Sequence, residues 1–234
     1  MKKRDHILFL IARRIWRLFP RAPRVRFWVW WGNIFPYQKI TYKGKVLSWG
    51  RDRTAAYELL FPTAPLGKTI LDVGCHTGFY CFEAASRGAK YCLGIDMDER
   101  RIAKGRVLVL QEEISNIDLV AADVRQYEFQ RPFDIVLCLN LLQHMGTIDR
   151  IDELLTHLHQ VAIERLILIV PLTTAPKLAY EYAFRDNIPY VLLSEKYFRA
   201  RYGENVQVLT LPSFCYGPNR AAVIVNKVVI PSGA

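Results

Sequence analysis

The sequence has no long apolar run near its start. In its basic first segment the longest uninterrupted apolar run, residues 7–12, is six residues long and is closed by Arg13 and Arg14. A membrane-spanning helix needs about 20 apolar residues and the core of a signal peptide about 7 to 15. We therefore expect this segment to be retained and not to cross a membrane.

Paired cysteine motifs are also absent. None of the five cysteines forms a C-x-x-C pair, which argues against a zinc site and against a disulfide framework. Several lie in apolar runs, as buried reduced thiols do. Their odd number favours a reducing compartment, so we expect a cytoplasmic protein with no metal. They are Cys75, Cys81, Cys92, Cys138 and Cys215.

The composition, 51% hydrophobic and 23% charged over 234 residues, excludes wholesale disorder and fits one domain with an appendage. The net charge is +10, but residues 1–26 hold nine Lys or Arg against one acid and contribute +8 of it. The rest of the chain is nearly neutral. A face that grips nucleic acid along its whole length is therefore not expected on the catalytic part.

Residues 1–53 form a basic, aromatic-rich N-terminal extension. Within it, apolar residues recur at helical spacing and basic residues fill much of the remaining positions, which predicts an amphipathic helix. Such a helix is suited to lie on the anionic surface of the inner face of a membrane. Packing against the domain and binding of RNA phosphates are alternative uses of residues 1–26. The apolar positions are Leu8, Ile11, Ile15 and Leu18.

From Thr69 onward, short β-branched runs alternate with helix-like stretches, which predicts a parallel sheet with helices on both faces. After Ser194, a helix cap, one helix precedes two adjacent strands that we expect to pair antiparallel. The expected strands are 69–73, 91–96, 117–122, 133–139, 165–170, 206–211 and 221–230. The expected helices are 79–87, a helix from about residue 98, 148–163 and 195–202.

Polar residues and glycines gather where these strands end. Gly74 and Gly78 follow the first strand and allow a sharp turn close to a ligand. Asp96 ends the next strand 22 residues after Gly74, near the distance at which an acid meets ribose hydroxyls in nucleotide-binding units. Asp123 and Asn140 follow two further strands. A dinucleotide fingerprint G-x-G-x-x-G is not matched, which disfavours a nicotinamide dehydrogenase.

Residues 69–171 resemble a class I S-adenosylmethionine-dependent methyltransferase. Asp72, Gly74 and Gly78 match the acid-x-Gly-x-Gly-x-Gly loop of that family, and His76 stands where the middle glycine is usual. The resemblance implies an α/β, doubly wound, Rossmann-like seven-stranded sheet, parallel with one antiparallel strand, in a methyltransferase domain over residues 54–234. It also implies S-adenosyl-L-methionine as the cofactor.

The resemblance further assigns residues to parts of the cofactor. It implies that the loop backbone lines the methionine moiety, that Asp96 holds the ribose hydroxyls, and that Met97, Asp123 and Val124 meet the adenine. Because the His76 side chain must point away from the cofactor or narrow its site, a noncatalytic adaptor recruited by its basic helix is an alternative. The cofactor-binding residues so implied are Asp72, Gly74, Cys75, His76, Gly78, Asp96, Met97, Asp123, Val124 and Asn140.

The candidate general base is His144, just beyond the fourth strand, although a histidine here also suits orienting the following helix. Residues 172–193 are an insertion that we interpret as an acceptor lid, with Tyr180 and Tyr182 shaping the pocket. The spacing of Tyr180 and Phe184 fits ordinary helix packing equally well. Trp49 and Arg51 close the same pocket from the N-terminal side.

Sequence motifs identify the methyl donor better than the acceptor. We favour a small-molecule or lipid-like acceptor. An RNA acceptor is the alternative, because residues 37–69 are similar to the region before the first strand in the tRNA wobble-uridine methyltransferase-like group. The nearly neutral catalytic part argues against RNA.

Overall fold

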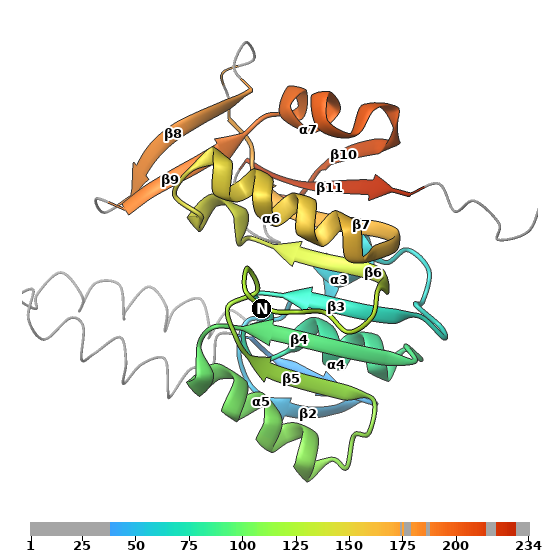
Figure 1. Cartoon of the computed structure of the whole chain (residues 1–234). Helices are drawn as coiled ribbons and strands as arrows, with labels where there is room; N and C mark the ends of the chain where they lie inside the picture. Colours follow the sequence, from blue (N-terminus) through green and yellow to red (C-terminus); the bar gives the residue numbers. More distant parts are fainter. Residues whose placement is uncertain (1–37, 174, 176–178, 186–187, 214–218, 228–234) are drawn as a thin grey trace, which may run out of the picture.

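The computed structural model describes residues 38–173, 175, 179–185, 188–213 and 219–227. The basic segment 1–26, with its expected amphipathic helix, lies outside these residues, as does Cys215. Three sheets and the helices around them make up the described part (Figure 1). None of the described helices combines the length and apolarity needed to span a bilayer.

The central sheet has seven strands in the order β10-β11-β7-β6-β3-β4-β5. Neighbours from β7 to β5 are parallel, whereas β11 is antiparallel to both β7 and β10. The predicted sheet, parallel with one antiparallel strand, is therefore confirmed. Its strands are β3 (Thr69–Val73), β4 (Tyr91–Asp96), β5 (Ile117–Ala121), β6 (Phe133–Leu139), β7 (Ala162–Pro171), β10 (Val206–Thr210) and β11 (Arg220–Asn226).

Helices cover both faces of this sheet, and each face has its own apolar core. One core joins the sheet to α3, α4, α5 and β1, and the other joins it to α6 and α7; Figure 1 shows α6 in front of the sheet. The helices are α3 (Thr54–Leu60), α4 (Phe79–Ser86), α5 (Glu99–Gln111), α6 (Ile148–Val161) and α7 (Glu195–Tyr202), with short 3-10 helices η1 (Leu142–His144) and η2 (Gly203–Asn205).

Helix boundaries follow the capping residues. Asp98 accepts backbone hydrogen bonds at the start of α5, and Ser194 Oγ accepts one from Tyr197 N at 3.2 Å at the start of α7. Helix α6 was predicted to reach Ile163, but it ends at Val161. Residue Ala162 already opens β7, because the last apolar residues of that stretch are needed to pair with β6.

Two small hairpins flank the central sheet. The first, β1 (Ile40–Tyr42) and β2 (Lys45–Ser48), packs on α4: Ile40 is fully buried and Thr41 Oγ1 donates to Glu83 Oε1 at 2.5 Å. The second, β8 (Tyr180–Arg185) and β9 (Ile188–Leu193), lies within the predicted lid. Tyr180 and Phe184 therefore lie on a strand, and the helix-packing interpretation of this pair was wrong.

Candidate active site

A tight turn connects β3 to α4. Its first two amides, of Gly74 and Cys75, both donate to the carbonyl of Ile95 on β4, at 2.7 and 3.1 Å. The turn has three residues with positive φ: Gly74 (74°), His76 (59°) and Gly78 (94°). Histidine in this left-handed region costs roughly 1 kcal/mol, so the turn holds His76 in a conformation that glycine adopts freely.

Asp96 ties the turn to the next strand. Its Oδ2 accepts from the backbone amide of His76 and its Oδ1 accepts from that of Asp98, both at 2.9 Å. The carboxylate is buried at the carboxyl end of β4, the place where doubly wound sheets bind ligands. Each carboxylate oxygen has a second lone pair, so Asp96 can also accept hydroxyl donors from a ligand.

Asp72 lies deeper, on β3 itself. It is 2% exposed, and its Oδ2 has no hydrogen-bond partner among the described residues. Burial raises the pKa of Asp72 to about 8, and the nearby Asp96 carboxylate adds to this. A buried acid that lacks a partner suits a site that receives a cationic group, and S-adenosylmethionine carries an ammonium and a sulfonium.

The His76 side chain is turned toward its own loop. Its Nδ1 lies 2.8 Å from Thr77 Oγ1. Burial lowers the pKa of His76 to about 4, with the Arg101 guanidinium contributing, so the imidazole is neutral at pH 7. His76 therefore adds no cationic charge to a site that is expected to bind a cationic ligand.

The expected adenine-side residues come from the ends of β4 and β5. Val124 is buried, and Met97 is 77% exposed beside Asp96. The Asp123 carboxylate pairs with Arg125, at 2.5 Å between Oδ2 and Nη2, and the hydrogen bonds from Arg125 hold the pKa of Asp123 below its usual range. Met97 follows β4, and Asp123 and Val124 follow β5, so these residues come after neighbouring parallel strands at one edge of the sheet.

The segment after β6 lies directly against the glycine turn. Leu141 side-chain atoms lie 3.5 Å from the position of a Cβ at Gly74. Asn140, with a φ of 57°, turns the chain, and its carbonyl accepts from Gln143 Nε2 at 2.8 Å. This segment continues into η1, which ends at His144. The candidate base is therefore three residues along the chain from Leu141, whose side chain lies beside the turn at Gly74.

The β8–β9 hairpin supplies the aromatic residues around His144. The Tyr190 ring meets the His144 imidazole edge-on, with centroids 5.2 Å apart. Tyr182 Oη accepts from the backbone amide of Ile148, at the start of α6, at 3.3 Å, and the rings of Tyr180 and Tyr182 are in contact. The hairpin therefore lies beside the predicted base. Of the two residues expected on the N-terminal side of the pocket, Trp49 is 74% exposed, and the backbone of Arg51 forms an isolated parallel β-bridge with that of Gln38.

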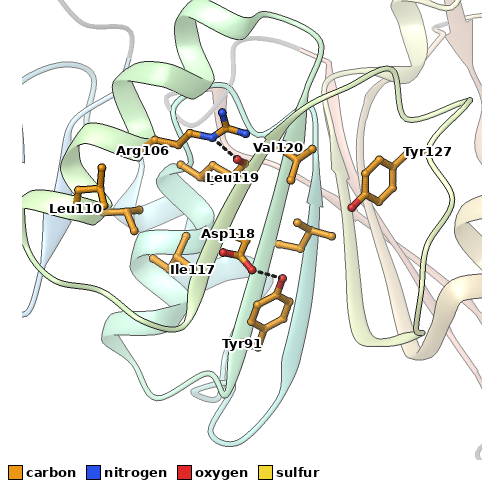
Figure 2. A pocket seen from close by; sticks show the side chains of 10 residues that line it. Tyr91, Arg106, Leu110, Ile117, Asp118, Leu119, Val120 and Tyr127 are labelled. Atoms are coloured by element: carbon orange, nitrogen blue, oxygen red, sulfur yellow. Dashed lines mark hydrogen bonds between the residues drawn. The ribbon is translucent and has the colours of Figure 1, made fainter.

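A separate cavity of about 440 Å³ lies along the outer edge of β5 (Figure 2). Arg106 Nε donates to the carbonyl of Leu119 at 2.7 Å, and Tyr91 Oη donates to Asp118 at 2.7 Å. The turn at residues 74–78, Asp96 and residues 140–144 form what we call the rim, and the cavity shares no lining residue with it. The described residues contain no cluster of His, Cys, Asp and Glu that could hold a metal.

The predicted lid, residues 172–193, already included Tyr190, but the sequence analysis missed Arg220 and Gly105. Tyr190 and Arg220 reach the rim from the hairpin and from β11, far from the motifs in sequence. Gly105 on α5 lets the helix approach the turn, since a Cβ there would lie 2.6 Å from the Thr77 carbonyl oxygen. A glycine within an otherwise regular helix was the one available signal, and it pointed to Gly105.

Comparisons with known proteins match the central part of the chain to methyltransferases. Residues 70–163 match the family model described as a methyltransferase domain. The ubiquinone biosynthesis O-methyltransferase of Acinetobacter baumannii is 37% identical over 81 residues, which is 34% of each chain. The corresponding Neisseria meningitidis protein is 32% identical over the same length. The chain thus matches about a third of the length of these curated relatives.

Solved structures extend the likeness in fold to most of the chain. A Burkholderia thailandensis 1,6-didemethyltoxoflavin-N1-methyltransferase aligns with a TM-score of 0.60 at 17% identity, over 75% of this chain and 76% of that one. The N-terminal domain of EvdMO1 aligns with a TM-score of 0.61 at 16% identity, over 87% and 96%. Residues 70–163 therefore match a methyltransferase domain, and the fold of most of the chain is similar to that of these solved methyltransferase structures.

Proposed function

We propose that the protein transfers the methyl group of S-adenosylmethionine to an oxygen of a small organic acceptor. The observation that carries this proposal is that the Leu141 side chain lies beside the turn at Gly74, and that the chain continues from Leu141 into the 3-10 helix that ends at His144. The cofactor, when bound, supplies an activated methyl group on its sulfonium. The protein then mainly has to align the partners and exclude water.

The residues divide between the two halves of this rim. Asp96 accepts the ribose hydroxyls, and the backbone of the glycine turn lines the methionine moiety. The positive charge of the bound cofactor favours ionisation of the buried Asp72. On the acceptor side, the imidazole of His144 takes the proton that a hydroxyl loses as it is methylated. The β8–β9 hairpin beside His144 keeps water from the reacting atoms.

Two observations support a small acceptor with a reactive oxygen. The Tyr190 ring of the hairpin packs against His144, and aromatic side chains of this kind line pockets that bind flat organic molecules. The curated relatives are named as O-methyltransferases of ubiquinone biosynthesis, and that match spans 81 residues. The chain outside residues 1–26 is nearly neutral, so it has little excess of basic residues to bind the phosphates of RNA.

Calorimetric titration with S-adenosylmethionine tests the first half of the proposal. Binding in the micromolar range is expected, and no heat at near-millimolar cofactor would favour the noncatalytic adaptor. Incubating cell extract with methyl-labelled cofactor tests the second half. Label is expected in the small-molecule or lipid fraction, and label in RNA would instead support the resemblance to the wobble-uridine group.

A further inference from the structure

We propose that Arg220 and Tyr190 form an anion-binding subsite that selects acceptors carrying a carboxylate. This inference rests on the proposed function, because it concerns the acceptor side of the same rim. The evidence does not depend on the turn at residues 74–78. It comes from the register of β11, the contacts of the Arg220 guanidinium and the position of the Tyr190 ring.

The register of the sheet places Arg220 at the active rim. Arg220 is the first residue of β11, which is antiparallel to β7, and its partner is Pro171, the last residue of β7. The first residue of β11 therefore lies at the edge of the sheet where the parallel strands have their carboxyl ends. Since neighbouring strands lie about 4.8 Å apart and β11 is two strands from β6, Arg220 starts roughly 10 Å from the end of β6.

The Arg220 guanidinium is only partly satisfied. Its Nη2 donates to Tyr190 Oη at 3.0 Å, while its Nη1 is buried and has no hydrogen-bond partner among the described residues. Arg220 also belongs to none of the ion pairs in the described part of the chain, in contrast to Arg87 and Arg201, which pair with acids. A buried cationic donor without an acceptor costs free energy, which an anionic ligand group would recover.

Tyr190 connects this guanidinium to the candidate base. One end of its side chain accepts from Arg220, and its ring meets His144 edge-on at 5.2 Å. Only 9% of Tyr190 is exposed, so its position is fixed by packing. An acceptor with its reacting hydroxyl at His144 therefore has a cationic group about one side chain away.

The chemistry of the subsite favours a carboxylate. A guanidinium offers parallel N–H donors that match the two oxygens of a carboxylate, and charge-assisted hydrogen bonds of this kind are among the strongest in proteins. The Tyr190 hydroxyl can donate to the same group once Arg220 turns toward it. A neutral acceptor would leave Nη1 of Arg220 without a partner.

Two small probes that differ by one carboxylate test the subsite: 3,4-dihydroxybenzoate and catechol. Their affinities are measured by calorimetry for the full chain saturated with S-adenosylhomocysteine, whose own binding is recorded first. The wild type is expected to bind the carboxylate probe about 10- to 100-fold more tightly than catechol. Arg220→Gln should abolish this preference, and Arg220→Lys should restore part of it.

Two further variants separate recognition from folding. Tyr190→Phe keeps the ring against His144 but removes the hydroxyl, so it should weaken binding of the carboxylate probe and leave catechol unchanged. Arg199→Gln removes a surface arginine that pairs with Glu195 on α7, and it should change neither affinity. Equal affinity of the wild type for both probes, including no binding of either, overturns the subsite, as does a preference that survives in Arg220→Gln. Failure to bind S-adenosylhomocysteine would instead count against the proposed function.

Discussion

Among single residues, Asp96 has the most direct connection to ligand binding. Replacing it with alanine removes the acceptor for ribose hydroxyls and also releases the amides of His76 and Asp98. We expect Asp96→Ala to weaken binding of S-adenosylhomocysteine by about 1 to 3 kcal/mol, the usual cost of losing charge-assisted hydrogen bonds. Isothermal calorimetry measures this change directly.

A matched control for this variant is Asp118→Asn on β5. Asp118 accepts from Tyr91 Oη and lines the separate cavity at the outer edge of the sheet, so its loss should leave cofactor affinity unchanged. If both variants bind as the wild type does, Asp96 is not the ribose ligand.

The raised pKa of Asp72 predicts a dependence of stability on pH. Its pKa is about 8 in the folded protein, against about 3.9 for an unfolded aspartate. Between about pH 4 and pH 8 the folded state therefore holds a proton that the unfolded chain releases, so this residue's contribution to stability falls as pH rises through that window. Above about pH 8 the contribution is constant.

Asp72→Asn should remove this dependence, because an amide of the same shape cannot ionise. The melting temperature of Asp72→Asn minus that of the wild type is expected to grow between pH 5 and pH 8 by at least about 2 to 4 °C, the shift that 1 kcal/mol gives in a chain of this size. The lowered pKa of His76 affects both proteins equally and cancels in the difference. A difference that stays constant with pH would show that Asp72 is ionised in the folded state.

At the scale of elements, the approach of α5 to the glycine turn depends on Gly105. A Cβ at this position would lie 2.6 Å from the backbone carbonyl oxygen of Thr77 and 2.4 Å from a methyl group of Leu119. Alanine normally stabilises a helix relative to glycine by about 1 kcal/mol. Here the clash should dominate, so we expect Gly105→Ala to lower the free energy of unfolding by about 1 to 3 kcal/mol and to weaken cofactor binding.

Denaturant unfolding of Gly105→Ala, compared with Val107→Ala, tests this packing. Val107 lies on the same helix and is 50% exposed, so its truncation should change stability by about 0.5 kcal/mol or less. A Gly105→Ala variant as stable as the wild type would mean that α5 can move away from the turn at little cost.

The sequence predicted elements well where their signals were local. The strands at Thr69–Val73, Tyr91–Asp96 and Phe133–Leu139 have the predicted bounds, because continuous apolar runs between turn residues mark buried parallel strands. The β1–β2 hairpin was not predicted, although Lys43 and Gly44 both have positive φ and form the two-residue turn that joins such strands. Lysine at the first of these positions is an unusual turn residue, which weakened the signal.

The residues of the site were also predictable only where their signal was local in the sequence. Motif residues such as Gly74 and Asp96 follow strands in sequence, so their meeting at one rim follows from parallel topology alone. Tyr190 contacts His144 only because of the tertiary placement of the β8–β9 hairpin, and Arg220 contacts Tyr190 only because β11 runs in the reverse direction. Their roles depend on long-range packing that carries no local sequence pattern.

For the whole molecule, the uneven distribution of charge sets the last prediction. Residues 1–26 carry +8 of the net +10, and we propose that they hold the protein at an anionic membrane surface, where each basic residue near the lipid contributes about 1 kcal/mol.

Deleting residues 1–26 should abolish cosedimentation with vesicles containing anionic phospholipid while affinity for S-adenosylhomocysteine stays constant. Vesicles of neutral phospholipid serve as the control, and binding to the anionic vesicles should weaken as salt increases, because exposed charges are screened. If the deletion leaves vesicle binding intact, the charges do not anchor the protein. If cofactor binding collapses instead, the segment packs against the domain, which is the alternative that its apolar residues equally suit.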